Sequence, residues 1–409
     1  MQTKLSPEFQ GTPEGQEAEA ILRKCVHCGF CTATCPTYQV LGDELDGPRG
    51  RIYLIKQVLE GGEPTRKTQL HLDRCLTCRN CESTCPSGVQ YGRLADIGRA
   101  VVERKVRRGP ADRALRWTLK EGLTSPAFGP AMKLGQSVRG LLPGRLKEKV
   151  PPRQDAGRWP SRSHARKVLM LAGCVQPSMM PNINAATARV LDATGIQTLV
   201  ASQAGCCGAV KFHLNDQEGG RAQMRANIDA WWPYVERGEV EAIVMNASGC
   251  GVTVKEYGHL LQHDAAYADK ARRIGELTRD LSELLPELAT ALQGRVRPPA
   301  GVVAWHPPCT LQHGQQLRGT VETQLARLGF DLRLPLNESH LCCGSAGTYS
   351  VLHPDIAHEL RDRKLGHLGA LQPSAIASAN IGCITHLQSG TATPVRHWVE
   401  LLDQAIAPA

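Results

Sequence analysis

The chain has 409 residues, 42% of them hydrophobic, so it is long enough for two or three domains that each bury a core. Its sixteen cysteines exceed what a reducing compartment leaves idle, and the N-terminal sequence lacks the basic start and apolar run of a secretory signal, so metal ligation explains the cysteines better than disulfides do. The net charge of the chain is +9, but it becomes smaller if the cysteines bind metal as negatively charged thiolates. Aromatic residues are scarce and are not interleaved with basic residues, as a single-strand nucleic-acid site would require. We therefore expect no nucleic-acid partner, and no apolar run approaches the ~20 residues of a membrane span.

Two cysteine runs near the N-terminus share one spacing. Residues 25–36 read CVHCGFCTATCP and residues 75–86 read CLTCRNCESTCP. In two-cluster ferredoxins with this spacing, three cysteines of one run hold one cluster and the fourth completes the other. Structural zinc more often uses two C-x2-C pairs, so the spacing favours two [4Fe–4S] clusters. The predicted ligands are Cys25, Cys28, Cys31 and Cys85 for cluster 1, and Cys75, Cys78, Cys81 and Cys35 for cluster 2.

The residues around these runs have helical periodicity. Apolar residues recur at three- and four-residue spacing in 52–60 and 94–106, which predicts an α-helical ferredoxin domain over residues 1–110. Residues 111–166 are basic, and rich in proline and glycine from 140 onward, so they are predicted to form a helical, basic linker. Arg49 and Arg51 either lie near a cluster, where positive charge raises its reduction potential, or cap and pack the next helix.

The second half of the chain contains a long internal repeat. In residues 167–295 a strand ends near Cys174, a helix follows, a second strand leads to the CCG triplet at 206–208, and a third strand leads to Cys250. The same order recurs in residues 296–409 at an offset of about 135 residues, which indicates two copies of one unit. Alternating strands and helices predict a parallel sheet in each unit. The fold class is thus α+β: a helical ferredoxin domain followed by a duplicated α/β CCG domain.

The cysteines of each repeat follow the strands, so the carboxyl ends of a parallel sheet would gather them. Each unit then offers four thiols, enough for an iron–sulfur cluster or for zinc. A vicinal disulfide, or small buried residues at a glycine turn, is the alternative. These further candidate ligands are Cys174, Cys206, Cys207 and Cys250 in the first unit, and Cys309, Cys342, Cys343 and Cys383 in the second. His386 is either a fifth ligand or a hydrogen-bonded histidine, and the same choice applies to His213, His306 and His313.

Iron–sulfur clusters transfer one electron at a time, whereas organic substrates are normally oxidised by two electrons. A flavin usually connects the two-electron oxidation to the one-electron transfers. The chain has no G-x-G-x-x-G, P-loop or G-x-S-x-G motif, so we expect the flavin on another subunit and none on this chain. No catalytic residue is predicted. The chain is expected to relay electrons within an oxidoreductase.

The two ferredoxin runs and the two CCG units resemble those of the bacterial glycolate oxidase iron–sulfur subunits. The resemblance rests on stretches such as CVHCGFCTATCPTYQVLGDELDGPRGRIYLIKQVLEG at 25–61, HLDRCLTCRNCESTCPSGV at 71–89, NIDAWWP at 227–233 and HLCCGSAGTYS at 340–350. It implies a complex in which a flavin-bearing subunit oxidises glycolate to glyoxylate, with a second flavoprotein-like subunit beside it. Electrons would leave through this chain toward a quinone or another acceptor other than NAD or oxygen. The chain would be cytoplasmic, or peripheral on the inner face of the plasma membrane.

The same relay could serve lactate, another 2-hydroxy acid, or glycerol 3-phosphate, because the partner's substrate pocket is not in this sequence. A heterodisulfide-reductase-like subunit is a further alternative. Fuller versions of the CCG motif end in C-x2-C, whereas here the corresponding positions are Thr253 and His386, which argues against that chemistry. A zinc-bearing scaffold without redox activity is the third alternative.

Overall fold

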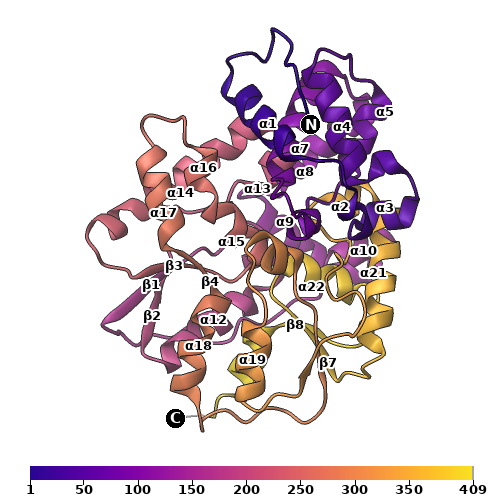
Figure 1. The fold of residues 1–409 in the computed structure, drawn as a ribbon. Coiled ribbons are helices and arrows are strands. Elements are labelled where there is room, and N and C mark those ends of the chain that lie inside the picture. The colour runs from indigo at the N-terminus through magenta and orange to yellow at the C-terminus, as the bar shows by residue number, and fades with distance from the viewer. Residues whose placement is uncertain (408–409) are drawn as a thin grey trace.

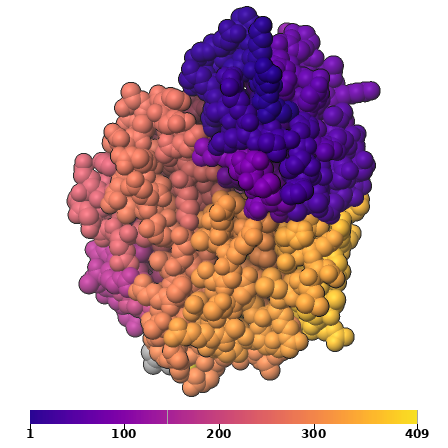
Figure 2. Space-filling view, viewed as in Figure 1, coloured from indigo at the N-terminus to yellow at the C-terminus, as the bar shows by residue number. Residues whose placement is uncertain are grey.

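The chain folds into three parts, an N-terminal domain and two α/β units, that pack against one another (Figure 1). The computed structural model describes residues 1–407, apart from the side chain of Arg145. An N-terminal helical domain lies against two α/β units, and the C-terminus lies at the opposite end of the molecule (Figure 1). In the space-filling view, the indigo N-terminal residues contact both the orange first unit and the amber second unit (Figure 2). A group held in the N-terminal domain can therefore lie close to groups in both units.

The N-terminal domain is helical, as predicted. Pro13, Pro36 and Pro48 each stand in the first turn of a helix, where the missing N–H costs nothing. Its core lies between α1, α4 and α7, which pack so closely that a Cβ on Gly98 would come 2.5 Å from the Ile55 side chain. The elements are α1 (Pro13–Lys24), α2 (Phe30–Ala33), α3 (Pro36–Leu41), η1 (Glu44–Asp46), α4 (Pro48–Leu59), α5 (Arg66–Asp73), α6 (Asn80–Thr84) and α7 (Tyr91–Lys105).

The predicted linker forms helices that bridge the domains. Its elements are α8 (Pro110–Gly122), α9 (Phe128–Ser137), η2 (Arg139–Leu141) and α10 (Gly144–Lys149). Lys120 in α8 forms an ion pair of 3.0 Å with Asp216 of the first unit, and Lys149 in α10 donates a 2.9 Å hydrogen bond to the Ser350 hydroxyl of the second. These contacts position the helices across the junction of the three parts.

The first unit contains a parallel sheet with the strand order β2-β1-β3-β4. Val168 in β1 lies opposite Thr198 in β2 and Ala242 in β3, which sets the register. Its elements are β1 (Arg166–Met170), α11 (Gln176–Met179), α12 (Pro181–Ala193), β2 (Ile196–Leu199), α13 (Ala209–His213), α14 (Gln217–Glu236), β3 (Ala242–Met245), α15 (Ser248–Lys255), α16 (Tyr257–Leu260), α17 (Ala268–Leu277), β4 (Thr278–Asp280) and α18 (Leu281–Leu292).

The second unit repeats this topology with the parallel strand order β6-β5-β7-β8. Its elements are β5 (Val303–Trp305), η3 (Thr310–Gly314), α19 (Thr320–Arg327), β6 (Leu332–Arg333), α20 (Tyr349–Leu352), α21 (Pro354–Gly369), β7 (Ala375–Ser378), α22 (Ile381–Gln388), β8 (Val395–His397) and α23 (Trp398–Ala405). The predicted duplication of a parallel α/β unit is therefore confirmed. Each sheet also has a fourth strand, β4 or β8, that the sequence pattern did not predict.

The two units share one hydrophobic core. Side chains of α12 and α18 in the first unit meet those of α19 and α23 in the second, and Trp305 and Trp398 are fully buried there. On the other face of the first sheet, Leu169, Ile243 and Met245 pack under α14 and α17 in a separate core. Alternate residues of the strands point into the two cores, so both faces of the first sheet are packed. This packing fixes the position of the carboxyl ends of the strands, after which the cysteines lie. Among the described residues, no helix combines the length and apolar character needed to cross a membrane.

Candidate iron–sulfur sites

The first group of thiols contains one cysteine from the second run. Cys25, Cys28, Cys31 and Cys85 line a small cavity of about 30 Å³ at the loop between α1 and α2, and Cys81 also reaches its wall. Burial, together with the nearby Cys25, Cys28 and Cys85 thiolates, raises the pKa of Cys31 to about 11. Thiols this close cannot all ionise unless a cation offsets their charge, so the donor set suits a metal or an iron–sulfur cluster.

The backbone of both loops adopts the same unusual conformation. His27 and Gly29 have φ values of 60° and 84°, and Thr77 and Arg79 repeat them at 53° and 59°. Left-handed residues at alternate positions fold the loop back on itself, so that successive thiols of one run point to one side. The repeated spacing in the sequence therefore produces a repeated thiol-bearing turn.

The second group consists of Cys75, Cys78 and Cys81 with Cys35 from the first run. Burial raises the pKa of Cys78 and Cys81 well above the ordinary thiol value, and negative charge on neighbouring cysteines, Cys35 among them, raises it further. The structure thus gathers eight cysteines into two groups, each with one member exchanged between runs. The thiol set of the second group again suits an iron–sulfur cluster.

Two buried arginines lie beside the second group. Arg51 donates hydrogen bonds to the His71 carbonyl at 2.7 Å and the Thr37 hydroxyl at 3.1 Å, and pairs with buried Asp46 at 3.5 Å. Arg99 donates to the carbonyls of Leu72 and Cys75, and no carboxylate of the described residues lies within ion-pair distance of it.

The charges of these arginines act on one thiol. Burial alone would raise the pKa of Cys75, but the positive charges of Arg51 and Arg99 outweigh burial and lower it. The second group therefore lies in a positive local field, whereas Arg49, beside the first group, is partly exposed and paired with Glu44 at 2.6 Å.

The cysteines of the second α/β unit form a third group. Cys309 follows β5, Cys342 and Cys343 lie in the loop after β6, and Cys383 lies in the first turn of α22. Their thiols hydrogen-bond in series, from Cys309 to Cys342, to Cys343 and to Cys383. The hydrogen bond with Cys342, together with burial, raises the pKa of Cys309 well above the ordinary value. For Cys343 the hydrogen bond with Cys342 lowers the pKa, but the hydrogen bond with Cys383 and burial outweigh it, so that its pKa is also raised.

This third group lies beside the second. Cys78 interacts electrostatically with Cys309, and Cys342 with Cys78, while Leu76 and Tyr349 pack around them in one buried cluster. The Tyr349 hydroxyl donates a 3.0 Å hydrogen bond to the Arg74 carbonyl, which fixes the contact between the domains. The second and third groups are therefore neighbours although they lie more than two hundred residues apart in sequence.

A buried lysine faces the third group. Lys364 in α21 donates hydrogen bonds to the carbonyls of Glu338 and Ser339, and lies near the charges of Cys309, Cys342 and Cys343. Burial lowers its pKa below the ordinary lysine value. The sequence analysis missed Lys364 and Arg99, because neither belongs to a motif and their approach to the thiols depends on tertiary packing.

The fourth group lies in the first α/β unit. Cys174, Cys206, Cys207 and Cys250 follow β1, β2 and β3, and their thiols also hydrogen-bond in series. The CCG loop is fixed by Asn227, whose amide donates a 2.8 Å hydrogen bond to the Cys206 carbonyl. Gly208 has φ of 95° and lies so close to α14 that a Cβ there would come 2.8 Å from the Gly220 carbonyl oxygen, which explains the glycine of the CCG triplet.

Three of the four histidines considered as ligands have hydrogen-bond partners within the protein. His306 shares a 3.1 Å hydrogen bond with the Ser378 hydroxyl, and His313 Nε2 donates to the His340 carbonyl at 2.8 Å. His386 Nε2 donates to the Ala357 carbonyl at 3.0 Å, and His213 lies 3.6 Å from Asp96. Hydrogen bonds therefore account for His306, His313 and His386, whereas the contact of His213 with Asp96 is longer than a hydrogen bond.

The comparisons with known proteins agree with this arrangement of thiols. Residues 21–89 match the family model of the 4Fe-4S dicluster domain, and residues 168–255 and 303–388 both match that of the Cysteine-rich domain. The fold and the thiol groups define an iron–sulfur electron-transfer protein that combines a ferredoxin domain with a duplicated cysteine-rich domain.

Curated relatives cover almost the whole chain. The chain is 57% identical to the glycolate oxidase iron-sulfur subunit of Escherichia coli K12, over 99% of this chain and 99% of the relative. It is 27% identical to the probable glycolate oxidase iron-sulfur subunit of Bacillus subtilis 168, over 91% of this chain and 89% of the relative. Lactate utilization protein A of Geobacillus thermodenitrificans NG80-2 is more distant, at 26% over 58% of this chain and 98% of the relative. The chain belongs to the family of glycolate oxidase iron–sulfur subunits.

Proposed function

We propose that the chain carries electrons within a glycolate-oxidising complex. A flavin-bearing subunit would oxidise glycolate to glyoxylate, a second flavoprotein-like subunit would complete the assembly, and electrons would leave through this chain toward a quinone or another acceptor. The observation that carries the proposal is the succession of thiol groups, in which Cys78 of the ferredoxin domain lies beside Cys309 and Cys342 of the second unit. The choice of glycolate rests on the 57% identity over the full length.

We assign the two ferredoxin groups to two [4Fe–4S] clusters. Cys25, Cys28, Cys31 and Cys85 would hold cluster 1, and Cys75, Cys78, Cys81 and Cys35 would hold cluster 2. The clusters supply one-electron carriers, and the chain supplies the thiolates and the local field. Because the positively charged Arg51 and Arg99 lie beside the second group, an added electron is more stable on cluster 2 than on cluster 1.

Electrons would enter at the first group. Cys28 is exposed, and two large apolar side chains beside it, Val26 and Phe30, are 68% and 60% exposed. Exposed apolar residues around a redox site are suited to docking another protein. We propose that the flavin-bearing subunit covers this loop.

The two cysteine-rich groups would hold further iron–sulfur clusters, with zinc as the alternative. The contact between Cys78 and the third group favours a redox centre there, since a zinc ion would end the electron path. A Cys309→Ser variant separates these alternatives. It should lose iron and sulfide from the third group while retaining both ferredoxin clusters, and loss of zinc instead of iron would show that the zinc alternative is correct.

A peripheral membrane contact would involve the helices of the bridging segment. Leu134, Val138 and Leu141 follow one another at four- and three-residue spacing and are exposed, as is Trp117 in α8. Basic residues outnumber acidic ones in this segment, a pattern that suits the anionic inner face of a plasma membrane. Flotation with anionic vesicles should retain the protein, and a Leu134→Ser/Leu141→Ser variant should weaken that retention.

The experiment that tests the function uses the complex purified anaerobically with its flavoprotein partners. Glycolate should reduce the iron centres, observed by low-temperature electron paramagnetic resonance, only when the flavin-bearing subunit is present. Lactate and glycerol 3-phosphate are tested in the same way as alternative substrates. Reduction by either of them in preference to glycolate would assign the relay to that substrate and contradict the proposal.

A further inference from the structure

A large cavity lies where the three parts of the chain meet. Its volume is about 700 Å³, and its walls include Cys75 and Cys78 of the ferredoxin domain, Cys206 and Cys207 of the first unit, and side chains of α8, α9 and α10. This volume lies within the range of small-molecule binding sites, about 300–1,000 Å³. The cavity extends from the thiols to the bridging helices and the second unit, beyond the groups that would hold iron and sulfide.

Part of the wall formed by the bridging segment is apolar. It is lined by Leu119 of α8, by Leu123 just after that helix, and by Phe128 and Met132 of α9, and Met132 is almost fully buried. Such side chains favour a flat apolar ring over a hydrated ligand.

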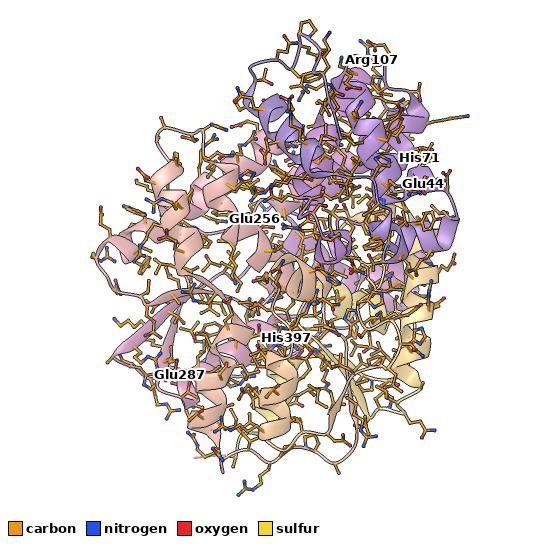
Figure 3. The ribbon with its side chains drawn as sticks, in the orientation of Figure 1. Glu44, His71, Arg107, Glu256, Glu287 and His397 are labelled. Carbon is orange, nitrogen blue, oxygen red and sulfur yellow. The ribbon has the colours of Figure 1, made fainter. Side chains whose placement is uncertain are left out.

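Charged side chains at the wall have partners within the protein. Arg116 pairs with Asp73 at 3.1 Å, and Arg79 pairs with Glu256 at 2.5 Å. Glu256 lies at the junction between the first unit and the N-terminal domain (Figure 3). Arg79 and Arg116 are therefore paired within the protein, whereas Arg99 and Lys149 at the same wall donate only to carbonyl and hydroxyl oxygens of the described residues.

Two histidine nitrogens at the wall are free to bind a ligand. His353 Nε2 and His386 Nδ1 are buried and have no hydrogen-bond partner among residues 1–407. His386 donates from Nε2 to the Ala357 carbonyl, so its Nδ1 carries a lone pair that can accept a proton donor. Burial lowers the pKa of both rings to about 4, so both are neutral near pH 7.

These features match a carbonyl-bearing ring that becomes a hydroxyl-bearing ring on reduction. The unpartnered Nε2 of neutral His353 can donate to the carbonyl of the oxidised form in one tautomer and accept from the hydroxyl of the reduced form in the other, whereas His386 Nδ1 can only accept. The His353 ring also packs at a tilt of 42° against Tyr349, with ring centroids 4.8 Å apart, next to the contact between the second and third thiol groups.

We propose that this cavity is the acceptor site of the relay and binds a quinone, with its ring between the histidines and the apolar wall of α8 and α9. The proposal deepens the proposed function and rests on it. Two electrons from glycolate reach the quinone singly through the adjacent thiol-held centres, and two protons come from water. The quinone is reduced to the hydroquinone as glycolate is oxidised to glyoxylate, so atoms and electrons balance.

The first test locates the bound quinone directly. The complete complex is irradiated with a photoreactive azidoquinone, and the labelled peptides are mapped. Labels are expected in residues 119–132 or near His353, and excess unlabelled short-chain quinone should prevent them. Competable labelling confined to another subunit, or to a different region of this chain, would overturn the acceptor site.

The second test fills the cavity. Leu119→Trp should raise the KM for a short-chain quinone by about tenfold or more, and lower azidoquinone labelling by a similar factor. Thr118→Trp is the matched control, because Thr118 is exposed on the same helix and does not line the cavity. Equal KM values and equal labelling for the two variants would overturn the proposal.

A third measurement separates this proposal from the proposed function. Glycolate-dependent reduction of the iron centres and of a dye that accepts electrons at the flavin should be unchanged in Leu119→Trp. If glycolate reduces the iron but azidoquinone labels another site, the acceptor site alone is wrong. If glycolate fails to reduce the iron in the unmodified complex, the proposed function itself is wrong.

Discussion

Arg99 provides the most specific prediction about the ferredoxin domain. Its side chain is buried, donates a 2.5 Å hydrogen bond to the Cys75 carbonyl and a 2.9 Å hydrogen bond to the Thr77 hydroxyl, and has no carboxylate partner in the described part of the chain. It therefore leaves an uncompensated positive charge beside the second thiol group. Arg99→Met removes that charge, and Arg99→Lys retains it.

The expected change follows from Coulomb's law. A unit charge at a separation of about 8 Å, in an effective dielectric constant of about 20, stabilises an added electron by about 2 kcal/mol. For a one-electron couple this corresponds to about 90 mV. Arg99→Met should therefore lower the midpoint potential of cluster 2 by about 90 mV, and Arg99→Lys should lower it much less.

The assay is a redox titration followed by electron paramagnetic resonance, with the signal of cluster 1 as an internal reference. Loss of Arg99 also leaves the Leu72 and Cys75 carbonyls without these donors, at about 1–3 kcal/mol each, so iron content and thermal unfolding must be measured in parallel. An unchanged potential in a folded, iron-replete Arg99→Met protein would refute the electrostatic reasoning. Equal shifts in Arg99→Met and Arg99→Lys would attribute the effect to geometry instead of charge.

Three further predictions concern other buried polar groups. Lys364→Met should lower the potential of a cluster in the third thiol group without moving cluster 1, as measured in the same titration, because a positive charge near three thiols is lost. Asn227→Ala should destabilise the first unit by about 2–3 kcal/mol in denaturant unfolding, because it removes three hydrogen bonds of the side-chain amide. Their partners are the Gly205 N–H, the Cys206 carbonyl and the Tyr257 hydroxyl. His397 accepts the Val399 N–H at the start of α23, within the core shared by the two units (Figure 3), and burial lowers its pKa to about 3. The unfolded chain binds its proton near pH 6.5 and the folded chain only near pH 3, so this contribution to stability is lost as pH falls from about 6.5 toward 3, by at most about 1.4 kcal/mol per pH unit. His397→Asn, which keeps a capping acceptor, should flatten that pH profile in urea titrations, and an unaltered slope would contradict the assignment.

The fold was predictable where the sequence contains apolar runs. Val168–Met170 and Ala242–Met245 are buried on both faces of a parallel sheet and therefore read as continuous apolar stretches. The edge strands β4 and β8 read Thr-Arg-Asp and Val-Arg-His, which are too short and too polar to distinguish from a loop. The bridging segment was expected as a helical, basic linker, but its packing was not predictable, because that packing depends on residues of both α/β units.

The proposed ligand sets rest on local spacing and on the repeat, both of which can be read from the sequence. The exchange of Cys35 and Cys85 between the two runs follows from the ferredoxin spacing, and the gathering of Cys174 with Cys206 follows from parallel-sheet geometry. The contact of Cys78 with Cys309 was not predictable, because no local pattern records how two domains dock. The same limit applies to Arg99, whose surroundings come from α5 and the following loop.

The central claim is that these thiol groups hold iron and sulfide and carry electrons. The most direct measurement is quantification of iron, acid-labile sulfide and zinc in the anaerobically purified complex. The account predicts roughly eight or more iron atoms and as many sulfides for each copy of this chain. Zinc without iron and sulfide would contradict it.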